Sequence, residues 1–205
     1  GPCGGKTTAL ARISKELPEK GYEVLIVPEA ATAIKNIGIK IGESKGYLSI
    51  EEFQRFIINF QIFQENLSQN YAKNLNDKDV IILYDRGLAD SNAYVDSKVY
   101  KKVLDEFDLT QIEARDRYNA VIHLKTVADG KEEYYTLANN IARTETAEEA
   151  RLVDKKTINA WIGHPHFRII DNSTDFDGKM DKLMSEIYTV LGLPIPIEIE
   201  NKYLI

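Results

Sequence analysis

The sequence predicts an α/β fold built on a parallel sheet, and three observations lead to that prediction. Short apolar runs alternate with longer stretches of helical periodicity, and the runs lie at residues 22–27, 79–84, 120–124 and 167–171. Alternation of this kind is typical of βαβ units. Two of the runs, at 22–27 and 79–84, are followed within two residues by an acid, as expected where parallel strands end at a ligand crevice. The chain also opens on a glycine-rich stretch that leads into a helical pattern.

Composition narrows the class of protein. The 205 residues are 43% hydrophobic and 28% charged, which is typical of one folded globular domain. A formal net charge of -6 disfavours nucleic acid as a partner, and no apolar run is long enough to span a bilayer. The single cysteine, Cys3, excludes an intrachain disulfide and fits a reducing compartment, so we expect a cytoplasmic protein.

The opening residues, GPCGGKTT, predict a phosphate-binding loop. The Walker A pattern is G-x-x-x-x-G-K-[ST], and Gly5, Lys6 and Thr7 supply its last three fixed positions. In such a loop the backbone N–H groups converge on phosphate oxygens, the lysine reaches the β- and γ-phosphates, and the threonine hydroxyl binds Mg²⁺. A glycine-rich turn without a ligand is the alternative. The residues expected to contact the nucleotide are Gly1, Pro2, Cys3, Gly4, Gly5, Lys6, Thr7 and Thr8.

A loop of this type follows a strand, and no strand precedes Gly1. We therefore expect that the chain begins within the motif and that the first strand of the sheet is missing. The helix after the loop is expected over residues 7–20, with Gly21 as its cap. Its buried face is expected to carry Leu10, Ile13, Ser14 and Leu17.

The strand at 22–27 ends at Pro28 and Glu29. Residues beyond the carboxyl end of a parallel strand face the ligand crevice. Glu29 is therefore either a solvated loop acid or an acid beside the phosphates, acting as a base or as a ligand of Mg²⁺-bound water. The residues themselves leave both readings open.

A long helix is predicted to run from Ser49 to about residue 75, because Ser49 and Glu52 form a capping box at its start. Before it, residues 30–42 are weakly helical. Seven apolar side chains of the long helix recur at helical spacing and are expected in the core: Phe53, Phe56, Ile57, Phe60, Phe63, Leu67 and Tyr71. Gln54, Gln61 and Gln64 are expected in solvent, with contact to an acceptor substrate as the less favoured reading.

The strand at 79–84 is followed by Asp85, Arg86 and Gly87. An aspartate at this place in a P-loop protein is the Walker B acid that holds Mg²⁺, and the adjacent arginine can bind a phosphoryl group. A surface ion pair is the alternative.

The remaining elements continue the alternation. His123, inside the strand at 120–124, is expected to be a satisfied core residue, and His164 and His166 are expected in a turn rather than at a metal. Asn172 and Ser173 would close a crevice in which a nucleobase could lie. Four helices are expected here: residues 98–107, a short helix capped by Thr110 and Glu113, residues 146–162 capped by Thr146 and Glu149, and residues 176–191 capped by Gly192.

Two arginines, Arg143 and Arg151, flank the start of the helix capped by Thr146. They suit either a closing lid of a phosphotransferase or an ordinary charged helix. After residue 192 the pattern changes to a stiff linker and an alternating run, IEIENKYLI. We therefore expect one domain over residues 1–192, and a linker with the first strand of another domain over 193–205.

The strings GPCGGKTTAL, VPEAAT, YDRGLADSNAY, RYNAVIHL, NNIARTETAEEARLVD and WIGHPHFRIIDNST together resemble the P-loop family often labelled AAA-type ATPase and fused to a CYTH domain. The family is similar to ribosylnicotinamide kinase and, more distantly, to deoxynucleoside and nucleoside-monophosphate kinases. The resemblance implies a P-loop NTPase three-layer sandwich with strand order 2-3-1-4-5, in which the missing first strand is the central one. We expect poor stability from that gap.

The resemblance also implies roles for individual residues. Glu29 would be the base on the acceptor hydroxyl, Asp85 and Arg86 the DR motif, and Arg143, with Arg151, part of the lid. In the tail, EIENK resembles the E-x-E-x-K signature of the CYTH, or triphosphate tunnel, fold. There Glu198 and Glu200 would bind a metal and Lys202 a polyphosphate, but one strand cannot form a tunnel, so we expect these three residues to be idle.

Two functions follow from these residues. The first is a Mg²⁺-dependent phosphotransferase acting on a small nucleoside-like acceptor, with Thr7 and Asp85 holding the metal and Lys6, Glu29, Asp85, Arg86 and Arg143 in catalysis. ATP is favoured as the nucleotide because no N-K-x-D string is present, although GTP is possible. The second is a module that binds ATP or GTP and regulates an attached CYTH domain with little or no catalysis.

Overall fold

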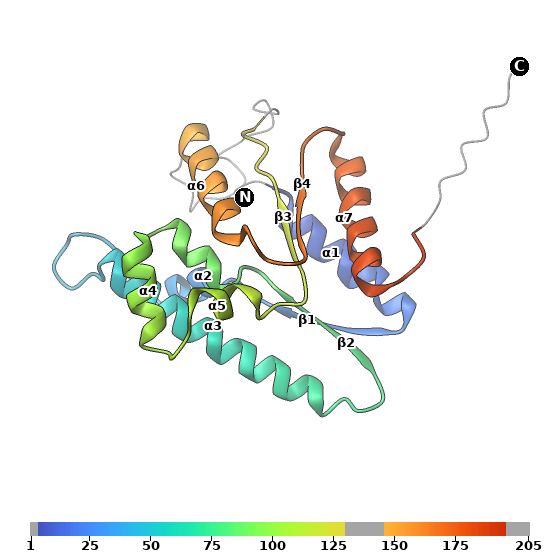
Figure 1. The fold of residues 1–205 in the computed structure, drawn as a ribbon, viewed down its shortest axis with the longest axis horizontal. Helices are drawn as coiled ribbons and strands as arrows, with labels where there is room; N and C mark the ends of the chain where they lie inside the picture. The colour runs from blue at the N-terminus through green and yellow to red at the C-terminus, as the bar shows by residue number, and fades with distance from the viewer. Residues whose placement is uncertain (1–3, 130–145, 196–205) are drawn as a thin grey trace, which may run out of the picture.

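The computed structural model describes residues 4–129 and 146–195. This part of the chain forms an α/β fold in which helices surround two pairs of parallel strands (Figure 1). The strands are β1 (Tyr22–Val27), β2 (Asp79–Tyr84), β3 (Val121–Leu124) and β4 (Phe167–Ile170). The helices are α1 (Lys6–Glu16), α2 (Ala30–Asn36), α3 (Ile50–Lys73), α4 (Ser97–Asp105), α5 (Gln111–Asp116), α6 (Ala147–Trp161) and α7 (Phe176–Leu191), and short 3₁₀ helices lie at Pro18–Lys20 and Leu88–Ala93.

Local sequence signals place most of these boundaries. All three expected capping boxes are present, at Ser49, Thr110 and Thr146, and each side-chain oxygen accepts the backbone N–H three residues later. Gly192 ends α7 in the left-handed conformation with φ 68°. The helix expected over 7–20 is shorter, because α1 stops at Glu16 and Pro18 begins a 3₁₀ turn.

The strands pair as two separate two-stranded parallel sheets. β1 pairs with β2 from Tyr22 opposite Asp79 to Val27 opposite Tyr84, and β3 pairs with β4 from Val121 opposite Phe167. These neighbours agree with the predicted order. Among the described residues, β2 and β3 do not pair with each other.

The main core lies between helices α1 and α7 and the strands. It contains Ile13 and Leu17 from α1, Leu124 and Ile170 from the strands, and Leu183 from α7. The strands themselves are less covered than the sequence predicts, since Ile26 is 44% exposed and Ile169 is 45% exposed. A second apolar cluster, around Ile58, Leu88 and Leu104, joins α3 to α4.

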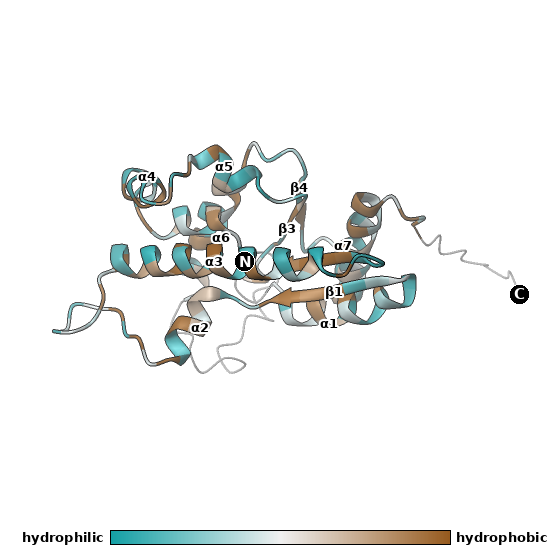
Figure 2. Ribbon diagram, turned by 90° about the horizontal axis from the view of Figure 1, so that it is seen from below, coloured by the Kyte–Doolittle hydropathy of each residue, from teal (hydrophilic) through white to brown (hydrophobic). Residues whose placement is uncertain are grey.

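The orientation of α3 differs from the prediction. Four of its expected core residues, Phe56, Phe63, Leu67 and Tyr71, are 42–60% exposed, and Gln54, Gln61 and Glu65 are buried in their place. Only Phe53 and Ile57 of the expected stripe are fully buried, and Phe60 is partly buried. Figure 2 shows hydrophilic and hydrophobic residues alternating along the length of α3. The buried polar face includes Glu65, which has two polar partners, Tyr118 and Arg117, described below.

None of the helices in the described part of the chain combines the length and the apolar character that a membrane span requires.

Candidate functional site

Charged side chains from three elements meet where β1 and β2 end and α1 begins. Glu29 follows β1, Asp85 and Arg86 follow β2, and Lys6 opens α1. Their mutual electrostatic influence places them in one cluster. Because parallel strands end at the same edge, the short turns after β1 and β2 bring Glu29 and Arg86, 57 positions apart in sequence, into contact.

Glu29 is held in place by two partners. The Thr32 hydroxyl donates to Glu29 Oε2 at 2.6 Å, and Arg86 Nε lies 3.4 Å from Glu29 Oε1. Burial disfavours the charged carboxylate, but the cations and the Thr32 hydroxyl outweigh it and lower the pKa of Glu29. Glu29 is therefore ionised at neutral pH and oriented toward the cluster.

Arg86 adopts a strained backbone conformation, with φ 85°. For a residue with a side chain this left-handed conformation costs about 1–2 kcal/mol. The guanidinium contacts two acids, since Nη1 lies 3.4 Å from Asp90 Oδ1 and Nε lies 3.4 Å from Glu29 Oε1. Burial works against the charge, yet Asp90 and Glu29 raise the pKa of Arg86. Asp90 in turn accepts the Gly87 N–H at 2.8 Å and so fixes the turn.

One carboxylate oxygen of Asp85 has no hydrogen-bond partner among the described residues. The Asp85 N–H donates to Val27 O at 2.9 Å and extends the β1–β2 ladder, while the oxygen without a partner, Oδ1, is buried. Burial raises the pKa of Asp85, and Glu29 adds to the effect while Lys6 opposes it. A buried carboxylate oxygen without a partner is costly. It is the arrangement expected of a group that binds a cation.

The donor set fits Mg²⁺ chemically. No group of three His, Cys, Asp or Glu side chains suited to a metal occurs in residues 4–129 and 146–195. Mg²⁺ does not need one, because it is usually held by one or two protein oxygens together with water and substrate phosphates. Asp85 Oδ1 and the exposed Thr7 hydroxyl are hard oxygen donors of this kind.

A glycine in a left-handed conformation leads into α1. Gly5 precedes the helix with φ 90°, which a residue with a Cβ rarely adopts, and a Cβ there would lie 2.9 Å from Phe176 Cε2. Burial and the nearby Arg86 lower the pKa of Lys6, whereas Asp85 and Glu29 raise it. Lys6 is thus a partly buried cation that an anionic ligand would stabilise.

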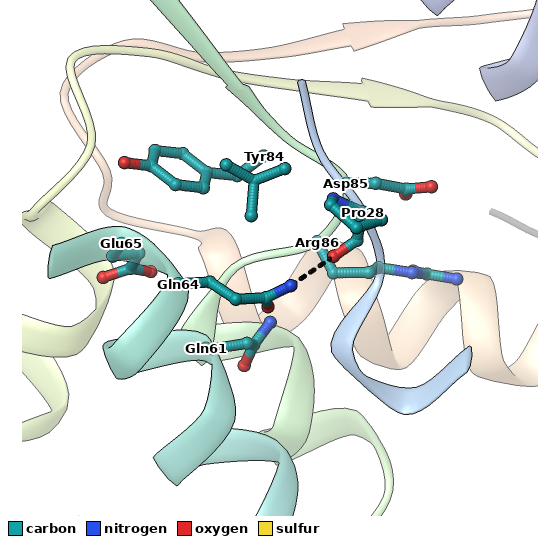
Figure 3. Close-up of a pocket in the computed structure, with 8 residues that line it drawn as sticks. Pro28, Gln61, Gln64, Glu65, Tyr84, Asp85 and Arg86 are labelled. Carbon is teal, nitrogen blue, oxygen red and sulfur yellow. Dashed lines mark hydrogen bonds between the residues drawn. The ribbon is translucent and has the colours of Figure 1, made fainter. Parts of the chain in front are cut away.

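A pocket opens beside this cluster, between α3 and the strand ends (Figure 3). Its cavity volume is about 10 Å³, room for about one water molecule, and Gln61, Gln64 and Glu65 line it from α3. Gln64 Nε2 donates to Pro28 O at 3.3 Å, but Gln61 Oε1 is buried with no partner among the described residues. The opposite wall is formed by Tyr84, Asp85 and Arg86. The pocket therefore joins unsatisfied polar atoms to the charged cluster.

Glu65, which lines the pocket, belongs to a partly buried set of hydrogen bonds. Tyr118 Oη donates to Glu65 Oε1 at 2.6 Å and accepts the Leu88 N–H at 2.8 Å. Arg117 Nε lies 2.8 Å from the other oxygen of Glu65. Burial raises the pKa of Glu65, although Tyr118 and Arg117 act in the opposite direction. These partners explain why Glu65 faces inward on α3.

Gly87 lets the turn after β2 pack closely against Tyr118 and α6. A Cβ at residue 87 would lie 2.8 Å from Trp161 and 2.9 Å from Tyr118, closer than packed carbon atoms come. The glycine therefore allows the turn after Arg86 to approach both rings, which meet edge to face at 5.5 Å.

The ends of β3 and β4 are joined differently. Asn172 Nδ2 donates to Thr126 O at 2.7 Å and to Asp129 O at 2.8 Å. Lys179, 3% exposed, donates to Asn172 Oδ1 and to Lys125 O, both at 2.7 Å. Burial lowers the pKa of Lys179 to about 8. Asn172, expected beside a nucleobase crevice, thus links the two loops.

The histidines have structural partners. His123 is buried, with Nε2 3.0 Å from Asp154 Oδ1, and burial lowers its pKa, so the expected satisfied core residue is confirmed. His164 uses both ring nitrogens, one with Tyr118 O at 2.9 Å and one accepting the His166 N–H at 3.1 Å, as in the expected turn.

One expected lid arginine has a partner in the described part of the chain, and several expected site residues fall outside that part. Arg151 Nη1 donates to Ala128 O at 2.9 Å, so this arginine contacts the loop after β3. Outside the described residues lie Gly1, Pro2, Cys3, Arg143, Glu198, Glu200 and Lys202. Their roles stay predictions.

Sequence reasoning missed Asp90, Glu65 and Lys179. Asp90 carried a signal, because an acid three residues after a glycine can cap the turn between them. Glu65 and Lys179 lie on helix faces whose burial depends on partners distant in sequence, Tyr118 and Asn172.

Comparison with known proteins finds one matching family model and a similar solved structure. The family model described as an AAA domain matches residues 1–179. A solved structure of deoxyadenosine kinase from M. mycoides with bound dCTP is similar at 14% identity and a TM-score of 0.38, over 82% of this chain and 98% of that chain. No curated protein matches.

Proposed function

The chain belongs to the AAA domain family, and from this premise we propose that it is a Mg²⁺-dependent phosphotransferase that moves a phosphoryl group from ATP to a small nucleoside-like acceptor. The observation that supports this most is the unpartnered, buried Oδ1 of Asp85, surrounded by Lys6, Glu29 and Arg86. That grouping contains an anion site, a cation site and a base within one edge of the fold.

The donor half of the site is the start of α1. The loop amides and Lys6 bind the phosphates, and an anion at this place offsets the burial that disfavours the charge of Lys6. The Thr7 hydroxyl and Asp85 hold Mg²⁺, which when bound neutralises charge on the β- and γ-phosphates. Arg86 binds the transferred group.

The acceptor half is the pocket between α3 and the strand ends. Its position beside Glu29 and Arg86 suits the hydroxyl end of an acceptor, because the cavity itself has room for about one water-sized group, and the free Gln61 Oε1 can accept an N–H or O–H there. Glu29 takes the proton of the attacking hydroxyl as the new O–P bond forms and the bond to the leaving ADP breaks. Arg86 holds Glu29 in place throughout.

The decisive measurement is ADP release with and without a panel of nucleosides. We expect acceptor-dependent ADP release from the wild-type chain and at least about 100-fold less from Lys6→Ala. Lys15→Ala, an exposed lysine on the same helix, is the matched control and should turn over like wild type. ATP and GTP are compared as donors in the same assay.

Two results would contradict the proposal. Tight nucleotide binding without turnover under any acceptor would instead support the regulatory module that gates a CYTH domain. Turnover that survives Lys6→Ala would place the chemistry outside the loop.

A further inference from the structure

One face of α3 is apolar and uncovered. Phe56, Phe63, Leu67 and Tyr71 are 42%, 57%, 60% and 52% exposed, and Phe60 stacks on Phe63 with ring centroids 6.2 Å apart. These five side chains, which we call the α3 stripe, lie opposite the buried polar face of the same helix. Contiguous exposed aromatic surface on a helix marks an interaction site.

The spacing of the α3 stripe is that of a helix that pairs with another helix. Phe56, Phe60, Phe63 and Leu67 are separated by four, three and four residues. This is the alternation of the two apolar positions of a heptad, whose side chains interlock with those of a facing helix. The sequence pattern thus favours a helical partner over a flat surface.

The residues beside the α3 stripe indicate which helix faces it as a partner. Glu52, Asn59, Asn66 and Lys73 recur every seven residues along one flank, and all four are exposed. The order is acid, amide, amide, base, so the flank is complementary to itself when it is read in reverse. A two-fold axis that meets α3 near Phe63 would set Glu52 of one chain against Lys73 of the other, and Asn59 against Asn66.

We propose that the α3 stripe docks against the α3 stripe of a second copy of this chain, with the two helices antiparallel. A parallel pair would place Glu52 beside Glu52 and Lys73 beside Lys73, which repel each other. The antiparallel pair has the closed two-fold symmetry of most homodimers. Half-exposed aromatic side chains supply on the order of 400 Å² of apolar surface per chain, about half of a standard interface side, so we expect a reversible dimer.

Cysteine cross-linking tests the geometry in the full chain with Cys3→Ser as the background. Phe63→Cys lies near the axis and should form a disulfide-linked dimer. Phe56→Cys alone should not, because its two copies would lie roughly 21 Å apart along the helices at about 1.5 Å per residue. Mixing Phe56→Cys with Tyr71→Cys should restore the cross-link. Gln69→Cys, exposed on α3 but off the stripe, is the matched control.

Sedimentation equilibrium tests the association itself. Leu67→Glu should raise the dimer Kd about 100-fold, since the change occurs twice across the axis, and Lys73→Glu should raise it about 10-fold. Leu67 is 60% exposed, so thermal unfolding of the monomeric variant reports that the fold is intact. A monomer at concentrations up to about 1 mM, or Phe56→Cys linking to itself as readily as Phe63→Cys, would overturn the proposal.

Discussion

The ends of the two strand pairs differ in how their polar atoms are used. After β1 and β2, Asp85 Oδ1 and Gln61 Oε1 have no partner among the described residues, and Arg86 is held in a left-handed conformation. After β3 and β4, the amide of Asn172 and the ammonium of Lys179 each bond to two oxygens or more in the neighbouring loops. At the β1–β2 end, buried polar atoms lack hydrogen-bond partners. At the β3–β4 end, the polar side chains form hydrogen bonds that join two loops.

This difference separates polar residues that bind a ligand from polar residues that stabilise the fold, which sequence patterns do not distinguish. Polar residues follow strands at both ends, so periodicity treats them alike. An unpaired buried oxygen destabilises the free protein and is relieved by a ligand, whereas a paired one stabilises the fold. Substitutions at the β1–β2 end should therefore affect activity more than stability, and those at the β3–β4 end should do the reverse.

The largest expected effect is at Asp85. Asp85→Asn should lower phosphoryl transfer by at least about 100-fold, because it removes the charge that binds the cation. Its melting temperature should stay within a few degrees of wild type, since Oδ1 has no bond to lose. Asp79→Asn, at the exposed beginning of the same strand, is the control and should change neither. Equal activity losses in both variants would argue against the role of Asp85.

The converse is expected at Asn172. Asn172→Ala should lower the free energy of unfolding by about 2–4 kcal/mol, because Thr126 O, Asp129 O and the Lys179 ammonium lose a partner together. Chemical denaturation measures the loss. Ser173→Ala, on the exposed neighbour that bonds only to surface groups, should cost far less. A stable Asn172→Ala would show that the two loops are joined by other contacts.

Lys179 makes the β3–β4 end sensitive to pH. Its pKa falls from 10.5 in the unfolded chain to about 8 in the fold, so between these values the unfolded state binds more protons. The free energy of unfolding should therefore rise with pH from about 8 to 10.5, by up to about 3 kcal/mol. Lys179→Met should remove that component, which is measured as the difference between the two pH profiles. Profiles of equal slope would contradict it.

The smallest change in stability is expected at Gln61. Gln61→Leu replaces a buried amide whose Oε1 is unpaired by an apolar group of similar volume, so the free energy of unfolding should change by less than about 1 kcal/mol. The KM for the acceptor should nevertheless rise, because the pocket loses its free oxygen. A large stability loss with an unchanged KM would mean that Gln61 belongs to the fold and not to the site.

The sequence locates the strands of the β1–β2 pair to the residue, because YEVLIV and DVIILY are apolar runs bounded by turn and charged residues. It also places Glu29, Asp85 and Arg86 at one edge, since parallel strands end together. Their proximity follows from topology alone. Their catalytic roles stay predictions.

The sequence does not predict which face of α3 is buried. A stripe of phenylalanines normally predicts a core, but helical periodicity only divides a helix into two faces. Here Glu65 faces inward because Tyr118 and Arg117 supply polar partners, and these residues are distant in sequence. The burial of Lys179 could not be predicted for the same reason, because its oxygen partners lie in two separate loops.

The separation of the strand pairs has a consequence for amide hydrogen exchange. Along a parallel ladder, N–H groups point alternately to the two neighbours, and Asp85 N donates to Val27 O, so the odd residues of β2 face β1. Ile81 and Leu83 should therefore exchange slowly. Val80 and Ile82 point to the side on which the described strands offer no partner, and they should exchange far faster. Deuterium would enter β2 at every second residue, and that alternation would disappear if another strand occupied its free edge.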